Sequence, residues 1–387
     1  MDFDLPDEIV ALQRMCRAFA EREIRPHAAD WSEREEIPTK LFRTMGELGL
    51  MGMLVDPKYG GEDAGFVAYV AAMEEIGRAD QSVASSWNAH STIASLPLAT
   101  FGTEEQKERW LRPLATGHNL GAFGLTEPGA GSDARGIRTR ARRGAGGWII
   151  NGTKMFITNA GAEMGLGVTL LAVTSGDTPQ DKRFGTFFVP DGTPGYTKGR
   201  RLKKLGWHAS DTRELVFADC FVPDDHLIGD EANGLRQFLA VLDPGRISVA
   251  ALAMSLAMAA LELAARHARE REQFGRTIDS FQAIRHKLAD MATEVEAARA
   301  LVYRAAWLAD AGRPFAEAAA MAKLYASEVA NRVASQAVQI HGGYGYLRES
   351  EISRFYADAK ILEIGEGTNE VQRNIIGQHV IRRLAGS

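Results

Sequence analysis

Cysteine and net positive charge are both scarce in this 387-residue sequence. The two cysteines, Cys16 and Cys220, lie far apart and outside any C-x-x-C spacing, which argues against a disulfide framework or a cysteine zinc site. Lys and Arg number 45 against 50 Asp and Glu, a net charge of -5. Without a basic excess to release counterions from phosphate, nucleic acid is not the expected partner. The nine histidines form no H-x-x-x-H or H-E-x-x-H pattern, so no metal site is predicted.

Targeting and membrane-spanning patterns are missing as well. The start, "MDFDLPDEIV", is acidic and has no apolar stretch of the kind found in signal peptides. The longest uncharged apolar run, 247–261, is shorter than the roughly 20 residues that a bilayer span needs. We therefore expect a cytoplasmic protein with no membrane span.

The pattern of apolar residues changes twice along the sequence. Apolar residues recur at helical spacing up to about residue 120, as in "IVALQRMCRAFA" and "FVAYVAAMEEIG". From 121 to 228, short β-branched and aromatic runs such as "GVTLLAVTS" and "ELVFADCFVP" lie between Gly, Asp and Pro. Longer helical patterns return over 229–387. These patterns predict an α+β multidomain fold: a helical N-terminal domain (1–120), an antiparallel, barrel-like β-domain (121–228) and a C-terminal helical bundle (229–387).

The loop "LTEPGAGSDA" (125–134) formally matches G-x-G-x-x-G/A through Gly129, Gly131 and Ala134. A Rossmann site also needs a following helix and an acid about 20 residues on, and the next residues, "RGIRTRARRGAGG", supply neither. Backbone N–H groups with the Thr126 and Ser132 hydroxyls could still hold an anionic or carbonyl-bearing ligand. A tight turn leading into a strand is an equally good interpretation.

"EIGEGTNEVQ" (363–372) places Glu366 between Gly365 and Gly367. Each glycine costs about 1 kcal/mol relative to alanine in a helix, so the pair marks a break or a close approach. A carboxylate on such bare backbone suits a catalytic base. An exposed Glu in an inter-helix loop is the simpler alternative.

Six motifs, in this order, point to one family. They are "LTEPGAGSD", "GTKMFITN", "LGWHASDTRELVFADCFVP", "REQFG…FQ", "QIHGGYGY" and "EIGEGTNEVQ". Over essentially its whole length the chain resembles the FAD-dependent acyl-CoA dehydrogenases, of a short/medium- or branched-chain type. The resemblance implies a helical N-domain, a β-domain and a C-terminal four-helix bundle.

The resemblance also implies a reaction. Family members convert an acyl-CoA thioester to the trans-2-enoyl-CoA, in fatty acid or branched-chain amino acid degradation. Glu366 matches the base that abstracts the α proton, and flavin N5 takes the β hydride. In some members the base lies instead on a bundle helix, at the position of Gly245, so Glu366 has no rival here. Alternatives on the same fold are an oxidase-like flavoenzyme that passes electrons to O2 and a non-catalytic acyl-CoA/FAD-binding protein.

Further site residues are implied by matching positions. Those matching FAD contacts are Phe123, Leu125, Thr126, Ser132, Phe156, Thr158, Arg271, Gln273, Phe274, Gln282, Gln339, Gly342, Gly343, Thr368 and Glu370. Those matching substrate contacts are Ser132, Asp243, Arg246, Gly365 and Gly367. Six of these matches reach the FAD of a neighbouring subunit in the family, which implies a homo-oligomer, most often a tetramer: Arg271, Gln273, Gln282, Gln339, Gly342 and Gly343. Electron-transfer flavoprotein is the implied electron acceptor.

Two features bear on the acyl group. Several straight-chain members carry Tyr where this chain has Gly365, and the missing ring leaves space beside the acyl chain. The stretch 86–96, "SWNAHSTIASL", would line the pocket and holds no Arg or Lys to pair with a second carboxylate. We expect a short to medium acyl-CoA, with branching near the β carbon tolerated.

Overall fold

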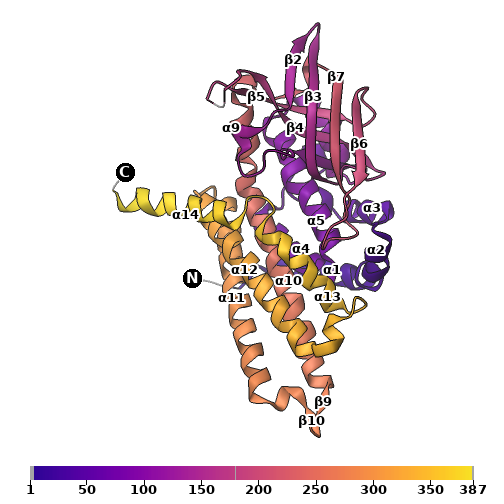
Figure 1. The fold of residues 1–387 in the computed structure, drawn as a ribbon, viewed down its shortest axis with the longest axis vertical. Helices are drawn as coiled ribbons and strands as arrows, with labels where there is room; N and C mark the ends of the chain where they lie inside the picture. The colour runs from indigo at the N-terminus through magenta and orange to yellow at the C-terminus, as the bar shows by residue number, and fades with distance from the viewer. Residues whose placement is uncertain (1–3, 179, 386–387) are drawn as a thin grey trace.

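The computed structural model describes residues 4–178 and 180–385. The molecule is elongated, with a sheet at one end and long helices running away from it (Figure 1). The N-terminal helices are α1 (Asp7–Glu23), α2 (Ala28–Arg34), α3 (Thr39–Glu47), α4 (Gly65–Ala79), α5 (Gln81–Asn88), α6 (Leu96–Phe101), α7 (Glu104–Gln106) and α8 (Arg112–Ala115).

Helix α5 carries Asn88 at its C-terminal end. Its N-terminus is capped by Asp80, whose side chain accepts a hydrogen bond from the Val83 N–H at 2.8 Å. After Asn88 the helix widens into a π-helical turn, Ala89–Ala94. Wide turns of this kind occur often at functional sites.

The strands form one sheet of eight. They are β1 (Leu120–Gly124), β2 (Arg140–Gly144), β3 (Gly147–Thr158), β4 (Gly165–Ser175), β5 (Arg183–Pro190), β6 (Tyr196–Arg201), β7 (Thr212–Pro223) and β8 (Leu227–Ile228). The order is β6-β7-β3-β2-β4-β5-β8, with β1 beside β4. Most neighbours are antiparallel, as the sequence predicts, but β4 runs parallel to both β1 and β2. The sheet is therefore mixed at β4.

The C-terminal part is a bundle of long helices. They are α9 (Gly234–Ala240), α10 (Leu242–Glu270), α11 (Gln282–Asp310), α12 (Ala316–His341), α13 (Glu351–Ala359) and α14 (Asn369–Leu384), with a small hairpin, β9 (Glu272–Gln273) and β10 (Arg276–Thr277), between α10 and α11. Helix α11 ends at Asp310, just before Gly312, which has a φ of +62°. Alanines on α10 and α12 let these two helices pack closely.

The N-terminal helices and the bundle share one apolar core. Trp87 of α5, Leu252 of α10 and Val329 of α12 belong to the same buried cluster, whereas Trp148 and Phe187 lie in a separate core within the sheet. By length and composition the stretch Gly234–Glu270 could cross a membrane, but 83% of its most apolar window is buried inside the protein. Burial of that extent is typical of the central helix of a bundle.

Candidate active site

The backbone at Glu366 is in an unusual conformation. The residue lies between the short helical turn Lys360–Glu363 and α14, with a φ of +51°, and Gly367 follows at +93°. Such left-handed conformations are uncommon for residues with a side chain and cluster at functional sites. Thr368 then caps α14 by accepting the Val371 N–H at 3.4 Å. The helix break predicted from the two glycines is present.

The Glu366 side chain points inward. Its Oε1 accepts a hydrogen bond from Asn88 Nδ2 at 2.9 Å. Its Oε2 is buried and has no hydrogen-bond partner in the part of the chain that the structure describes. The residue as a whole is half-buried, whereas its Oε2 atom is closed off from solvent. Burial raises the pKa of Glu366 to about 8.

Two cations oppose that effect. Lys323 of α12 is fully buried, and its Nζ donates to Asn369 Oδ1 at 3.0 Å. Burial lowers the pKa of Lys323 to about 8, against the attraction of Glu366. Arg246 of α10 forms an ion pair with Asp243, one turn away, and its Nε has no partner among the described residues. Both positive charges favour the ionised form of Glu366.

Gly245 leaves room for the carboxylate. A Cβ at this position would lie 2.5 Å from Glu366 Oε2 and 3.3 Å from Ile93 Cγ2. At Gly365 a Cβ would meet only the Ile361 carbonyl oxygen, at an ordinary 3.5 Å. Glu366 thus lies against bare backbone on α10, with open space beside Gly365.

Several of the predicted flavin-lining residues lie together in the β-domain. Phe123 of β1 stacks on Phe238 of α9, with ring centroids 4.0 Å apart. The Thr126 carbonyl accepts the Met155 N–H at 2.8 Å, which ties the 125–134 loop to β3. Leu125 lies at the start of this loop, and its carbonyl accepts a hydrogen bond from Lys154 at 3.1 Å.

A buried ion pair between Lys154 and Glu127 anchors the 125–134 loop to β3. Lys154 donates to Glu127 Oε1 at 2.8 Å, and Glu127 also accepts the N–H groups of Arg138 and Thr139. Burial lowers the pKa of Lys154 to about 8. Truncating one partner of such a pair would leave an unpaired buried charge.

The outer surface of this loop and strand is open. Phe156 is 65% exposed and has a φ of +63°. Thr158 is half-buried at the end of β3, Ser132 is exposed, and a Cβ at Gly129 or Gly131 would meet nothing within 4 Å. Bare backbone, a hydroxyl and an exposed aromatic ring leave a surface that a planar ring could cover.

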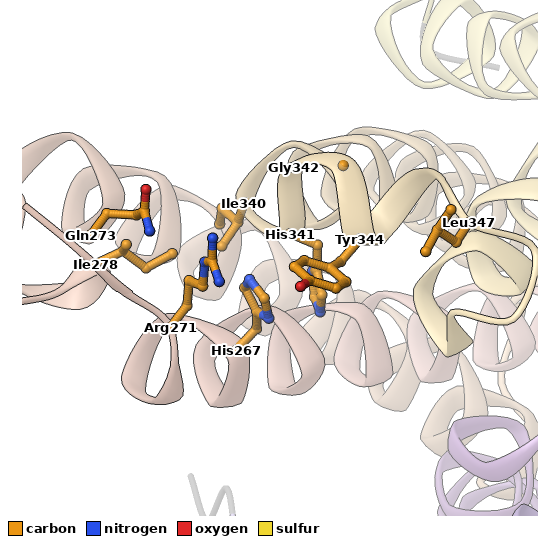
Figure 2. Close-up of a pocket in the computed structure, with 10 residues that line it drawn as sticks. His267, Arg271, Gln273, Ile278, Ile340, His341, Gly342, Tyr344 and Leu347 are labelled. Atoms are coloured by element: carbon orange, nitrogen blue, oxygen red, sulfur yellow. The ribbon is translucent and has the colours of Figure 1, made fainter.

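The remaining predicted cofactor residues form a second group, at the β9–β10 end of the bundle. Arg271, Gln273 and Gly342 are among the residues that line a pocket of about 560 Å³, shown in Figure 2. The pocket is lined by His267, Arg271, Gln273, Ile278, Ile340, His341, Gly342, Gly343, Tyr344 and Leu347. The Arg271 guanidinium lies 5.5 Å from the centre of the Tyr344 ring, and the imidazoles of His267 and His341 stack at 4.3 Å. The predicted residues Phe274, Gln282 and Gln339 are exposed outside this lining.

The two groups are not brought together within one chain. The sheet lies at one end of the molecule and the β9–β10 hairpin at the other, joined by the 29-residue helix α10 (Figure 1). A helix of that length spans about 40 Å. Glu370 and Thr368 lie with Glu366 at the start of α14, away from the hairpin.

Sequence reasoning assigned no role to three residues near Glu366: Asn88, which donates to it, Tyr69, which donates to Asn88, and Lys323, whose charge favours its ionised form. Lys323 gave a signal, because it interrupts an alanine-rich stripe on α12 whose neighbours are buried. Asn88 lies in the 86–96 stretch expected to line the pocket, but its hydrogen bond to Glu366 depends on the tertiary fold and was not predicted.

Comparison with known proteins identifies the chain. Its residues 6–118, 122–220 and 232–381 match the models for the N-terminal, middle and C-terminal domains of acyl-CoA dehydrogenases. The chain belongs to the acyl-CoA dehydrogenase family. A probable acyl-CoA dehydrogenase of Bacillus subtilis, YngJ, is 46% identical over 99% of this chain and 100% of its own length.

Solved structures extend this likeness to the fold of the acyl-CoA dehydrogenases. Butyryl-CoA dehydrogenase from Megasphaera elsdenii has a TM-score of 0.95 at 41% identity, covering 99% of this chain and 100% of that one. A chain in a structure described as the electron transferring flavoprotein of Acidaminococcus fermentans reaches 0.96 at 41% identity, with the same coverage. The predicted family, fold class and cofactor are confirmed, and the protein is an FAD-dependent flavoenzyme.

The residues present fit FAD. A backbone-rich loop and an exposed, strained Phe156 offer a surface to a flat ring system. Arg271 offers a fork of donors suited to a diphosphate, beside the open backbone of Gly342 and Gly343.

Proposed function

We propose that Glu366 is the catalytic base of an acyl-CoA dehydrogenase, removing the α proton of an acyl-CoA thioester on the way to the trans-2-enoyl-CoA. The observation that carries this proposal is the state of its carboxylate. One oxygen is hydrogen-bonded to Asn88, and the other is buried without a partner beside the bare backbone of Gly245. A dry carboxylate with a raised pKa is suited to accept a proton from a weakly acidic carbon.

Different residues of the chain would contribute to basicity, to substrate binding and to stabilisation of the thioester carbonyl. Burial makes Glu366 more basic, while Lys323 and Arg246 keep the ionised form accessible. The helix break at Gly365 and Gly367 lets the backbone of Glu366 approach the thioester, where its N–H can donate to the carbonyl oxygen. Asp243 and Arg246, at the start of α10, would contact the CoA moiety. FAD, when bound, takes up the two electrons and the second hydrogen, which leave from the β carbon.

We propose that FAD is held by two chains. Phe123, Leu125, Thr126, Ser132, Phe156 and Thr158 would contact it from one protomer. Arg271, Gln273, Phe274, Gln282, Gln339, Gly342 and Gly343 would reach it from a neighbour, with Thr368 and Glu370 near Glu366. The support is the separation of the two groups within one chain and the exposure of the second. A homotetramer would satisfy both groups.

The substrate class follows from the open space at Gly365. We expect a short to medium acyl-CoA, straight or branched near the β carbon, in agreement with the butyryl-CoA dehydrogenase among the similar structures. Electron-transferring flavoprotein is the proposed acceptor, supported by the similar chain in the Acidaminococcus structure. Comparing peroxide release with reduction of that acceptor would distinguish a dehydrogenase from an oxidase.

Two further proposals concern organisation. The division into domains at 1–120, 121–228 and 229–387 is supported by the change from helix to strand at Leu120 and back to helix at Gly234. A cytoplasmic location is supported by the similarity to a Bacillus subtilis protein.

Replacing Glu366 with Gln tests the function directly. The amide keeps the shape of the side chain but cannot accept the proton, so turnover should fall by at least about 10²–10⁴-fold. FAD content and acyl-CoA binding should persist, measured by flavin absorbance and by titration with a substrate analogue. Glu363→Gln, three residues earlier and paired with Lys360, is the matched control. Near-normal turnover in flavin-replete Glu366→Gln would refute the assignment.

A further inference from the structure

Three side chains from distant segments meet in a line at Glu366. The Tyr69 hydroxyl of α4 donates to Asn88 Oδ1 at 3.3 Å. Asn88 Nδ2, at the end of α5, donates in turn to Glu366 Oε1 at 2.9 Å. Tyr69 and Asn88 are 0% and 3% exposed, respectively. No role in the dehydrogenation has been assigned above to either residue.

We propose that Tyr69 and Asn88 are positioning residues for the base, and that they make Oε2 the oxygen of Glu366 that accepts the substrate's α proton. The proposal rests on the function proposed for Glu366. It adds which atom reacts and which residues select it.

The direction of the hydrogen bonds follows from the chemistry of the groups. An asparagine amide has an acceptor end and a donor end, and the two can exchange by a flip. The ionised carboxylate of Glu366 can only accept, so it selects the NH2 end of the amide and leaves Oδ1 to accept the Tyr69 hydroxyl proton. A flipped amide would set its oxygen against a carboxylate oxygen. By satisfying the acceptor end of the amide, Tyr69 supports Asn88 as the donor to Glu366.

The backbone of Asn88 is fixed as well. The Thr92 hydroxyl donates to the Asn88 carbonyl at 2.8 Å, at the start of the π-helical turn that follows α5. The amide thus has little freedom to follow Glu366 if that side chain moves. A rigid donor on Oε1 fixes the plane of the carboxylate and leaves Oε2 free beside Gly245.

The hydrogen bond from Asn88 also affects the ionisation of Glu366. Burial opposes ionisation of Glu366, and the Asn88 hydrogen bond favours it, followed by the charges of Lys323 and Arg246. Arg246 shares its charge with Asp243. Because the site is dry, water cannot replace a donor that is removed. Loss of the Asn88 N–H should therefore make Glu366 harder to ionise.

The experiment compares Asn88→Leu, Asn88→Asp and Tyr69→Phe with the wild-type holoenzyme. The measurement is the pH dependence of kcat/KM for butyryl-CoA, which reports the ionisation of groups in the free enzyme. In the wild type, activity should rise with pH through an apparent pKa of about 8, as Glu366 ionises. Asn88→Leu should move this rise up by roughly one pH unit or more. Asn88→Asp should move it further, since a second carboxyl group would face the first, and Tyr69→Phe should move it least.

A readout independent of turnover is the infrared band of the protonated carboxyl group. It can be followed through a pH titration and assigned to Glu366 by its loss in Glu366→Gln. Its midpoint should shift in the same order as the kinetic profile. Ser85→Ala is the matched control, because this buried α5 hydroxyl only donates to the Ser82 carbonyl at 3.0 Å. It should leave both profiles in place.

The outcomes separate the two proposals. If Glu366→Gln is inactive while Asn88→Leu keeps FAD, melting temperature and an unshifted profile, the positioning proposal is overturned and the function stands. If Glu366→Gln is active, both fall. Should Asn88→Leu fail to fold, Tyr69→Phe decides the question, because it removes one hydroxyl, and a profile equal to wild type overturns the proposal.

Discussion

The site around Glu366 and the face around Arg271 differ in almost every physical respect. The first is buried, and a hydrogen bond from α5 and charges on α10 and α12 act on one carboxylate. At the second, Phe274 is 91% exposed, and a Cβ on Gly342 or Gly343 would meet nothing within 4 Å. The first is enclosed within one chain, although Glu366 Oε2 has no hydrogen-bond partner among the described residues. The second shows surface that a single chain leaves uncovered.

The two regions meet different physical requirements. Setting a pKa requires exclusion of water, which the shared core of the N-terminal helices and the bundle provides. Holding a large dinucleotide requires extended surface, and an oligomer can supply it from two chains. The two regions should therefore fail independently when mutated.

Gly245→Ala should impair the site around Glu366 and leave the face around Arg271 intact, with the largest effect on kcat. Its Cβ would lie 2.5 Å from Glu366 Oε2, so the carboxylate must move while the fold persists. A misplacement of about 1 Å can cost on the order of 10²-fold in rate. We expect at least that loss in kcat, with FAD content and solution mass unchanged. Gly377→Ala, where a Cβ would meet nothing within 4 Å on α14, is the control. A Gly245→Ala enzyme with full kcat would contradict the described geometry.

Arg271→Ala should weaken FAD binding and subunit association and leave the site around Glu366 intact. A lost charge-assisted hydrogen bond is worth roughly 1.5–3 kcal/mol, so FAD should bind about 10–100-fold more weakly, with a lower mass in light scattering. Glu366 should still titrate as in the wild type. Arg276→Ala removes a neighbouring cation that instead lies 4.2 Å from the Phe281 ring centre and serves as the control. Unchanged flavin affinity and mass would make Arg271 an ordinary surface residue.

The sequence predicts the two regions unequally well. The order of helices and strands follows from local periodicity, and the break at Glu366 follows from its two glycines. The 2.9 Å contact between Asn88 and Glu366 joins residues 278 positions apart, and no local pattern encodes it. The parallel neighbours of β4 were missed for the same reason, since pairing is set by tertiary packing. The role proposed for the exposed residues around Arg271 would depend on a second chain, and only the family resemblance suggested it.

Gly365→Tyr should change the substrate preference and leave both groups of predicted cofactor residues unaltered. A Cβ fits here, and the ring would fill the space beside the acyl chain. A methyl group in an apolar pocket is worth about 1–3 kcal/mol, so kcat/KM for isovaleryl-CoA relative to butyryl-CoA should fall about tenfold. Glutaryl-CoA should remain a poor substrate throughout. An unchanged ratio, or glutaryl-CoA as the best substrate, would remove the basis for this pocket.

Asp358 offers the smallest effect and the sharpest contrast to Glu366. This buried carboxyl accepts the Trp207 N–H, and burial raises its pKa to about 7, with Asp80 adding to the rise and Arg354 opposing it. The pKa of Asp358 is raised like that of Glu366, but Asp358 belongs to no proposed site, so we expect it to affect stability and not the reaction.

Because the folded state holds the Asp358 proton more tightly than the unfolded chain does, the contribution of Asp358 to the free energy of unfolding is complete below about pH 4 and is lost as pH rises to about 7. Asp358→Asn cannot ionise and still offers an oxygen to Trp207. Relative to wild type it should gain stability between pH 5 and pH 8, on the order of 1 kcal/mol or a few degrees in Tm, with kcat unchanged. A parallel pair of Tm–pH curves would show that Asp358 keeps an ordinary pKa in the folded protein.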